Sequence, residues 1–297
     1  MKQIESKNNP IIKRAIKAIN NPSGEKLIVV EGHKLLNEAL KSGAKPEMIF
    51  ISCEENGLPR SLTTARNDDY NSNLLVNNHN NKTNHTYHKP DELVTCKETI
   101  NYENITYKVS RGLMRELSTV QTPSEIIAFL TPAISPELEE VVKKSIMLVV
   151  LDRLQDPGNI GTIMRTAEAM GASAIILLKG CCNPNNHKVI RAAMGSSFRL
   201  PIVSNVDVKK LFDLLNRNAY QTICADMEGT ILQKFNFTGK SAIFMGQEGQ
   251  GLSDYIINNC KSRVAIPMCG QVESLNVATS TAIFLYEWSR NNVRDES

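Results

Sequence analysis

The alternation of apolar runs and helix-periodic segments is clearest from residue 145 onward. Continuous apolar runs separated by helices predict a mainly parallel sheet covered on both faces. In such sheets ligands bind at the carboxyl ends of the strands. The predicted strands are SIMLVVL, SAIILL, RLPIV, QTICAD, SAIFMG and RVAIPM. The loops DPGNIG, GQEGQG and CGQVESLN follow three of these strands and are therefore the first places to look for a site.

A smaller α/β unit precedes residue 131. Its pattern predicts the strands KLIVV, MIFIS, ITYKVS and EIIAFL and the helices HKLLNEALKSG and RGLMRELST. The sequence thus predicts a first domain over residues 1–131, a proline-containing linker over 132–144 that leads into a short helix, and a second domain over 145–297.

An Asn-rich stretch of about residues 56–104 interrupts the first domain. It has no periodicity and few apolar residues, so we expect an exposed, flexible insertion. Its histidines, His79, His85 and His88, have no carboxylate or thiol at ligand spacing. We therefore expect no metal site there.

The segment LDRLQDPGNIGTIMRTAEAMG, residues 151–171, runs from a strand through a loop into a helix. Asn159 is a candidate N-cap of this helix, because asparagine is among the best capping residues. Arg165 points away from the apolar face and is ordinarily interpreted as a surface arginine. Alternatively, both side chains face one cleft at the end of the strand. The predicted core face consists of Ile160, Ile163, Met164, Ala167 and Met170.

The last helix follows the loop CGQVESLN, and Ser274 is its candidate N-cap. Free backbone N–H groups beside an apolar strand end can hold a small polar ligand with a flat apolar part. The order of the glycines in the three loops does not match the dinucleotide fingerprint G-x-G-x-x-G, and no G-K-[ST] occurs. The predicted core face of the last helix is Val277, Thr281, Phe284, Leu285 and Trp288.

Net charge is only +3, so overall charge does not by itself indicate a nucleic-acid partner. The first twenty residues, however, carry five lysines and arginines against Glu5, an excess that suits phosphate backbones or, alternatively, a solvated helix face. The seven cysteines form no C-x-x-C pair, which predicts reduced thiols and no zinc site. No apolar run has membrane-spanning length and no signal core opens the chain, so we expect a cytoplasmic protein.

Three motifs together resemble the SpoU/TrmH class of the α/β-knot (SPOUT) RNA methyltransferases. They are DPGNIGTIMRTAEAMG, MGQEGQGL and IPMCGQVESLNVATSTAIF, with KVIRAAMGSSFRLPIV between the first two. LIVVEGHKLLNEAL and VSRGLMRELSTVQTP also resemble the small ribosomal-protein-like substrate-binding domain of many ribosomal-RNA members. One departure is Pro123-Ser124-Glu125, where the family often has Pro-Gln-Gly.

The resemblance implies a fold, a cofactor and a site. The fold is α/β, with a C-terminal trefoil-knot domain that has a mainly parallel sheet, preceded by the small substrate-binding domain. The cofactor is S-adenosyl-L-methionine, held by backbone groups at Gly246, Ile266 and Leu275. The implied partners are RNA and a second copy of the chain, with no membrane and no metal. The implied catalytic residues are Arg165, Asn159, Glu248, Ser274 and Asn276, and the expected RNA contacts are Lys13, Arg14, Lys34 and Arg191.

The reaction that the resemblance implies is methyl transfer to a ribose 2′-hydroxyl, with large-subunit ribosomal RNA as the leading substrate. Transfer RNA is the alternative within the class. A non-catalytic RNA-binding or ribosome-assembly protein is the alternative from another class, and a small-molecule α/β enzyme is a third. A guanidinium hardly ever deprotonates in proteins, so our hypothesis is that Arg165 positions the hydroxyl and stabilises oxyanion charge.

Overall fold

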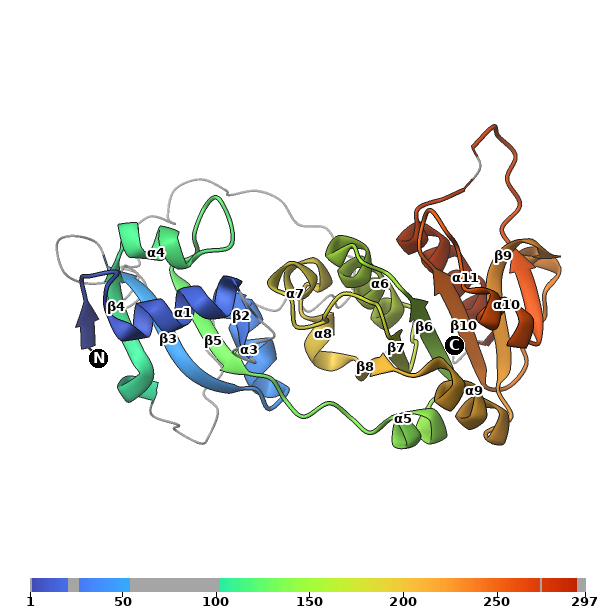
Figure 1. Ribbon diagram of the computed structural model, residues 1–297, viewed down its shortest axis with the longest axis horizontal. Helices are drawn as coiled ribbons and strands as arrows, with labels where there is room; N and C mark the ends of the chain where they lie inside the picture. Colours follow the sequence, from blue (N-terminus) through green and yellow to red (C-terminus); the bar gives the residue numbers. More distant parts are fainter. Residues whose placement is uncertain (1, 21–26, 54–101, 273, 293–297) are drawn as a thin grey trace, which may run out of the picture.

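The computed structural model describes residues 2–20, 27–53, 102–272 and 274–292. They form two β-sheets that share no strand and lie side by side along the long axis of the molecule (Figure 1). The predicted insertion of residues 56–104, with its three histidines, lies outside the described residues except at its end. That end begins the 3-10 turn η2 (Tyr102–Ile105).

The first sheet has the strand order β1-β4-β3-β5-β2. β1 pairs parallel with β4, and β4 pairs parallel with β3, whereas β5 is antiparallel to both β3 and β2. The opening tripeptide β1 was not predicted, because only Ile4 of its three residues is buried and no alternation is visible. The strands are β1 (Lys2–Ile4), β2 (Ile28–Glu31), β3 (Lys45–Cys53), β4 (Thr106–Ser110) and β5 (Ile126–Thr131).

Helices cover both faces of the first sheet. α1 (Pro10–Asn20) and α4 (Arg111–Leu117) share one hydrophobic cluster, and α3 (His33–Lys41) contributes to the cluster on the opposite face. In α1 the buried residues Ile12, Ala15 and Ala18 recur every three positions, so the basic residues between them are exposed. Lys13, Arg14 and Lys17 therefore lie on the solvent-exposed face of an amphipathic helix.

The second sheet is parallel throughout, which confirms the predicted fold class. Its strand order is β11-β9-β10-β6-β7-β8, and every neighbouring pair is parallel. The chain builds outward from β6 to β8 and then crosses to the other side, where β10 enters between β6 and β9. The strands are β6 (Met147–Asp152), β7 (Ala174–Leu178), β8 (Ile202–Val206), β9 (Gln221–Ile231), β10 (Ser241–Gly246) and β11 (Ser262–Ala265).

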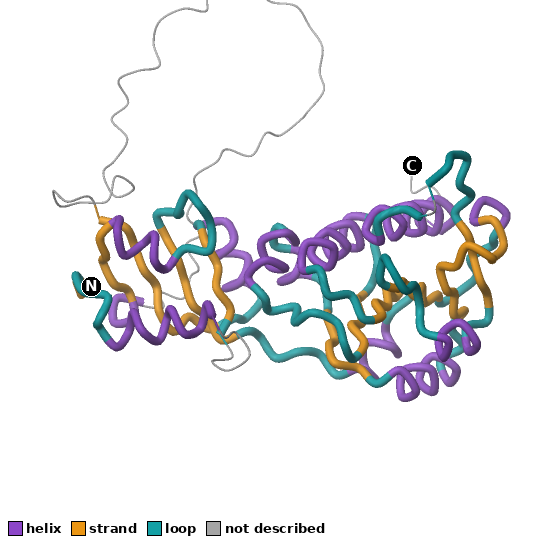
Figure 2. The backbone as a smooth tube through the Cα atoms, turned by 45° about the horizontal axis from the view of Figure 1, so that its top comes forward, coloured by secondary structure: helices purple, strands orange, loops and turns teal. Residues whose placement is uncertain are grey.

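Two groups of helices cover the second sheet, one on each face (Figure 2). One cluster joins the sheet to α6 (Pro157–Ala169), α7 (His187–Ala193) and α11 (Val277–Asn292). The other joins it to α5 (Leu138–Lys144), α9 (Val208–Arg217) and α10 (Asp254–Asn259). The predicted core residues of α6 and α11 are buried, apart from the half-buried Met170 at the end of α6.

Three predicted strands have different limits in the structure. The predicted strand RLPIV begins only at Ile202, because the short helix α8 (Ser196–Arg199) ends just before it. β9 continues past the predicted Asp226 to Ile231 and is followed by the 3-10 turn η3 (Leu232–Lys234), while β11 ends at Ala265. Among the described residues no helix is long and apolar enough to cross a membrane, and none of the cysteines forms a disulfide.

Gly161, the second glycine of DPGNIG, lies where α6 and α7 meet. A Cβ atom at this position would come within 2.5 Å of Ala192 Cβ and 2.6 Å of Val189 O. Real Cβ atoms do not approach backbone that closely, so this glycine allows the two helices to touch. The glycine is needed for helix packing, and a phosphate-cradling role is not required to explain it.

We expect Gly161→Ala to lower the free energy of unfolding by about 2 kcal/mol, because overpacking a close contact costs more than helix propensity returns. Chemical denaturation measures the change. Gly112→Ala in α4 is the matched control, because its Cβ would meet nothing closer than Ser110 Oγ at 3.7 Å. Equal stability of both variants would contradict the packing role of Gly161.

Candidate active site

A cavity of about 470 Å³ lies at the carboxyl ends of β10 and β11 and beside the middle of β9. Its walls come from the end of β10 and the loop after it, from the middle of β9, and from the segment between β11 and α11. That last segment projects from the body of the molecule (Figure 1). The lining includes Ala225, Asp226, Met227, Met245, Gly246, Glu248, Gly251, Leu252, Val264, Ile266, Met268, Ser274, Leu275, Ser280 and Phe284.

The three positions predicted to hold the cofactor, Gly246, Ile266 and Leu275, all line this cavity. Gly246 ends β10, Ile266 follows β11, and Leu275 lies two residues before α11. The structure thus brings the second and third motifs together at one place, although residues 253–265 separate them in sequence.

The middle of β9 forms a wall that the sequence did not predict. Arg263 of β11 pairs with Cys224, but the next residue, Val264, pairs with Thr230. Residues 225–229 therefore bulge out of the ladder toward the cavity. Within the bulge, Asp226 accepts a hydrogen bond from the Glu228 N–H at 3.0 Å and lies 3.6 Å from the Arg263 guanidinium.

The loop after β10 is held in place by the end of β6. Asp152 is buried, and its Oδ2 accepts a hydrogen bond from Ser253 N at 3.0 Å. Arg153, with a positive φ of 58°, contacts Asp152 and donates to Gly251 O at 3.3 Å. These two residues of the first motif region fix the second motif, a role that sequence reasoning missed. The signal was a carboxylate at the end of an otherwise apolar strand.

Glu248 joins the starts of α6 and α11. Its Oε1 accepts hydrogen bonds from Asn159 Nδ2 at 3.0 Å and from Asn276 Nδ2, and lies 3.4 Å from the Val277 N–H. Asn276 Nδ2 also donates to Asn159 Oδ1 at 3.0 Å. Three of the predicted catalytic residues, one from each motif, therefore form a single cluster beside the cavity.

Both predicted helix caps are wrong. Asp156 caps α6, with its Oδ1 accepting from Asn159 N at 2.7 Å, because Pro157 takes the first helical position that proline favours. Asn276, and not Ser274, caps α11: its Oδ1 accepts from Ala278 N at 2.9 Å and from Thr279 N at 3.3 Å. The amide of Asn159 is therefore free to contact Glu248, while Ser274 lines the cavity.

Arg165 lies apart from this cluster. It is exposed, does not line the cavity, and has no hydrogen bond or ion pair with any described residue. It lies six positions after Asn159 on α6, which corresponds to about 9 Å along the helix axis and about 120° around it. The structure therefore does not bring Arg165 to the cluster of Asn159, Glu248 and Asn276.

The predicted RNA contacts lie on helices of both domains. Lys13 of α1 and Lys34 of α3 are exposed, and Arg14 of α1 lies 3.5 Å from Glu47. Arg191 of α7 donates to Thr119 O at 3.4 Å and so lies where the two domains meet. No contact among these four residues joins them into a single cluster.

The thiols that follow β7 are held protonated. Cys181 donates to Leu151 O at 3.2 Å, and burial raises the pKa of its thiol to about 11. Burial also raises the pKa of Cys182. Neither cysteine is therefore a thiolate nucleophile at neutral pH.

Comparison with known proteins places this chain in one class, the RNA methyltransferases. The model of the SpoU rRNA Methylase family matches residues 146–286. An uncharacterized tRNA/rRNA methyltransferase of Synechocystis is 35% identical over 186 residues, which cover 62% of this chain and 67% of that protein. The 23S rRNA (guanosine(2553)-2′-O)-methyltransferase RlmP of Bacillus subtilis is 27% identical over 96% of this chain and 98% of its own length.

The chain belongs to the SpoU rRNA methylase family. The fold is also that of a solved structure, an AdoMet-bound rRNA methyltransferase from Sinorhizobium meliloti, with a TM-score of 0.75 and 22% identity over 99% of both chains. The likeness covers both sheets, so the small first domain is part of the shared architecture.

We expect Asn276→Asp to keep the cap of α11 but to place a second carboxylate against Glu248. Like charges in contact raise the pKa of one carboxylate, so the variant is destabilised above that raised pKa and regains stability as pH falls. The loss of about 1 kcal/mol at pH 7 should disappear below about pH 4, where both carboxyls of the unfolded chain are also protonated. Chemical denaturation of the variant and the wild type at several pH values measures this difference in the free energy of unfolding.

Asn276→Ala is the comparison variant, because it removes the cap together with the contact to Glu248. Its loss of about 1 kcal/mol should not depend on pH in this way. An Asn276→Asp variant whose deficit is the same at both pH values would contradict the contact.

Proposed function

We propose that this protein transfers a methyl group from S-adenosyl-L-methionine to a ribose 2′-hydroxyl of large-subunit ribosomal RNA. The observation that carries the proposal is the cavity at the strand ends, lined by Gly246, Ile266 and Leu275, with the cluster of Asn159, Glu248 and Asn276 beside it. The near full-length similarity to a 23S rRNA 2′-O-methyltransferase supports this substrate over transfer RNA.

The cavity fits a cofactor of this kind. Its volume is within the range of about 300–1,000 Å³ typical of small-molecule sites, and its walls combine apolar and polar groups. Met245, Leu252 and Phe284 form an apolar surface, while Asp226 and Ser274 add polar groups. Backbone groups at the three predicted positions would hold the cofactor, which supplies an electrophilic methyl group on a sulfonium when bound.

The residues of the chain would prepare the ribose for attack. A 2′-hydroxyl is a poor nucleophile, so it must lose its proton as its oxygen attacks the methyl carbon of the cofactor. The attack is in line with the carbon–sulfur bond that breaks. Arg165 keeps its charge, so it would orient the hydroxyl and an adjacent phosphate and stabilise the developing oxyanion. Ser274 and Asn276 would fix the nucleotide, and Glu248 would hold Asn159 and Asn276 in position.

A homodimer fits the position of Arg165. The guanidinium is exposed and does not line the cavity of its own chain. The proposed reaction, however, needs an Arg165 side chain and a cofactor cavity next to the same ribose. A second protomer would bring an arginine to the cavity of the first. Lys13, Arg14, Lys34 and Arg191 would contact RNA, and a ribosomal RNA substrate supports a cytoplasmic location.

Two measurements test the proposal directly. Calorimetry should detect binding of S-adenosyl-L-methionine, and a map of 2′-O-methyl groups in total RNA should lose one ribosomal site when the gene is removed. Absence of binding at high micromolar cofactor would overturn the methyltransferase proposal. Loss of a transfer-RNA site instead would support the proposed reaction but contradict the proposed ribosomal substrate.

We expect Arg165→Lys to lower the turnover number at least tenfold, because lysine keeps the charge but loses the planar fork that aligns hydroxyl and phosphate. Cofactor affinity should stay within about twofold, since Arg165 does not line the cavity. Methyl transfer to ribosomal RNA and calorimetry give the two quantities.

Arg217→Lys at the exposed end of α9 is the matched control and should behave as the wild type. Near wild-type turnover of Arg165→Lys would show that this arginine does not position the ribose. In the proposed dimer, mixing Arg165→Ala protomers with protomers altered at Ser274 should restore part of the activity that each variant lacks alone.

A further inference from the structure

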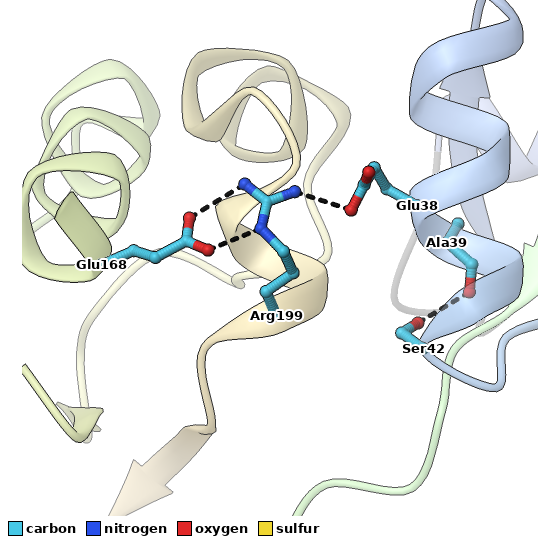
Figure 3. A network of polar contacts seen from close by, with 5 residues as sticks. All are labelled: Glu38, Ala39, Ser42, Glu168 and Arg199. Carbon is cyan, nitrogen blue, oxygen red and sulfur yellow. Dashed lines mark hydrogen bonds and ion pairs between the residues drawn. The ribbon is translucent and has the colours of Figure 1, made fainter. Parts of the chain in front are cut away.

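Arg199 of α8 joins three helices across the boundary between the two domains. Its Nε and Nη2 bond both carboxylate oxygens of Glu168 on α6, at 2.5 and 2.9 Å. Its Nη1 bonds Glu38 on α3 of the first domain at 2.7 Å. Figure 3 shows the guanidinium between the two carboxylates, so one side chain connects the two domains.

The guanidinium of Arg199 and the carboxylates of Glu38 and Glu168 favour one relative orientation of the three helices. A guanidinium that engages a carboxylate with two parallel bonds is specific in direction as well as in distance. The hydrogen bonds from Arg199 hold the pKa of Glu168 below its usual value, and the pKa of Arg199 is raised by the same contacts. Gly195, with a φ of 94°, lies close to the bridge, because a Cβ atom there would come within 2.8 Å of Arg199 Nη1.

Packing around the bridge is continuous between the domains. Ile190 of α7 is only 1% exposed and belongs to the hydrophobic cluster of α3 and the first sheet. Nearby, Arg191 donates to Thr119 O, and Glu31 of β2 accepts from Thr119 N at 2.7 Å. The only covalent connection here, residues 132–137, has no regular structure. The junction, and not the connection, therefore sets the angle between the domains.

The bridge ends on the helix that carries the proposed chemistry. Glu168 is on α6, three residues after Arg165, so both belong to the last turn and a half of the same helix. A rigid helix transmits a displacement at one point to its other side chains. The position of the first domain is thus tied to the position of Arg165.

We infer that Glu38, Arg199 and Glu168 are positioning residues, which set the angle at which RNA held by the first domain reaches the site on the second. The inference rests on the proposed function. It implies a substrate class, namely a folded RNA large enough to touch both domains at once. None of the three side chains needs to contact the reacting atoms.

The test uses the full chain with Glu38→Gln, which keeps the shape and removes the charge, and Arg199→Lys, which keeps the charge and removes the fork. We expect the KM for a folded ribosomal RNA fragment to rise about tenfold, because a small misplacement of bound substrate is costly. The turnover number at saturating RNA should fall less, and cofactor affinity should not change. Small-angle scattering should show a larger radius of gyration.

Glu140→Gln is the control, because Glu140 forms an exposed ion pair with Lys144 within α5 alone. It should leave KM and scattering unchanged. If the wild type is active and both bridge variants match it in KM and scattering, the inference is wrong. If the wild type methylates no RNA, the proposed function fails, while scattering still shows whether the bridge fixes the domains.

Discussion

The insertion of β10 between β6 and β9 is the constraint on which the second domain depends. β10 pairs in register with β6 over six residues and with β9 over four, and its side chains are buried on both faces. Because all three strands are parallel, their carboxyl ends meet at one edge. The cavity and the cluster around Glu248 form at that edge. A change of β10 register would displace Gly246 and the whole second motif.

Periodicity predicted the parts of the fold that depend on burial. The apolar faces of α6 and α11 follow the 3.6-residue repeat because the hydrophobic effect selects one side of each helix. The caps were predicted wrongly because several polar residues precede each helix, and which one caps depends on a single bond. The bulge of β9 could not be predicted at all, since it exists only through pairing with β11.

The candidate site shows the same division between local and non-local information. Motif resemblance selected Gly246, Ile266 and Leu275, and these residues converge on one cavity. The support of that cavity by Asp152 and Arg153 connects residues about a hundred positions apart, through contacts that no local pattern encodes. Arg165 is the clearest case, because the helical repeat gives its direction but not the molecule that it faces.

The burial of Ile190 has a consequence for how the protein can be dissected. This side chain belongs to the second domain in sequence but is covered by the first, with Phe198 packed against the same cluster. Cutting the chain before residue 145 would uncover both, and exposing an isoleucine alone costs about 2 kcal/mol. The isolated second domain would carry an exposed apolar patch. Poor solubility of this fragment would therefore reflect the missing contact with the first domain and not a failure to fold.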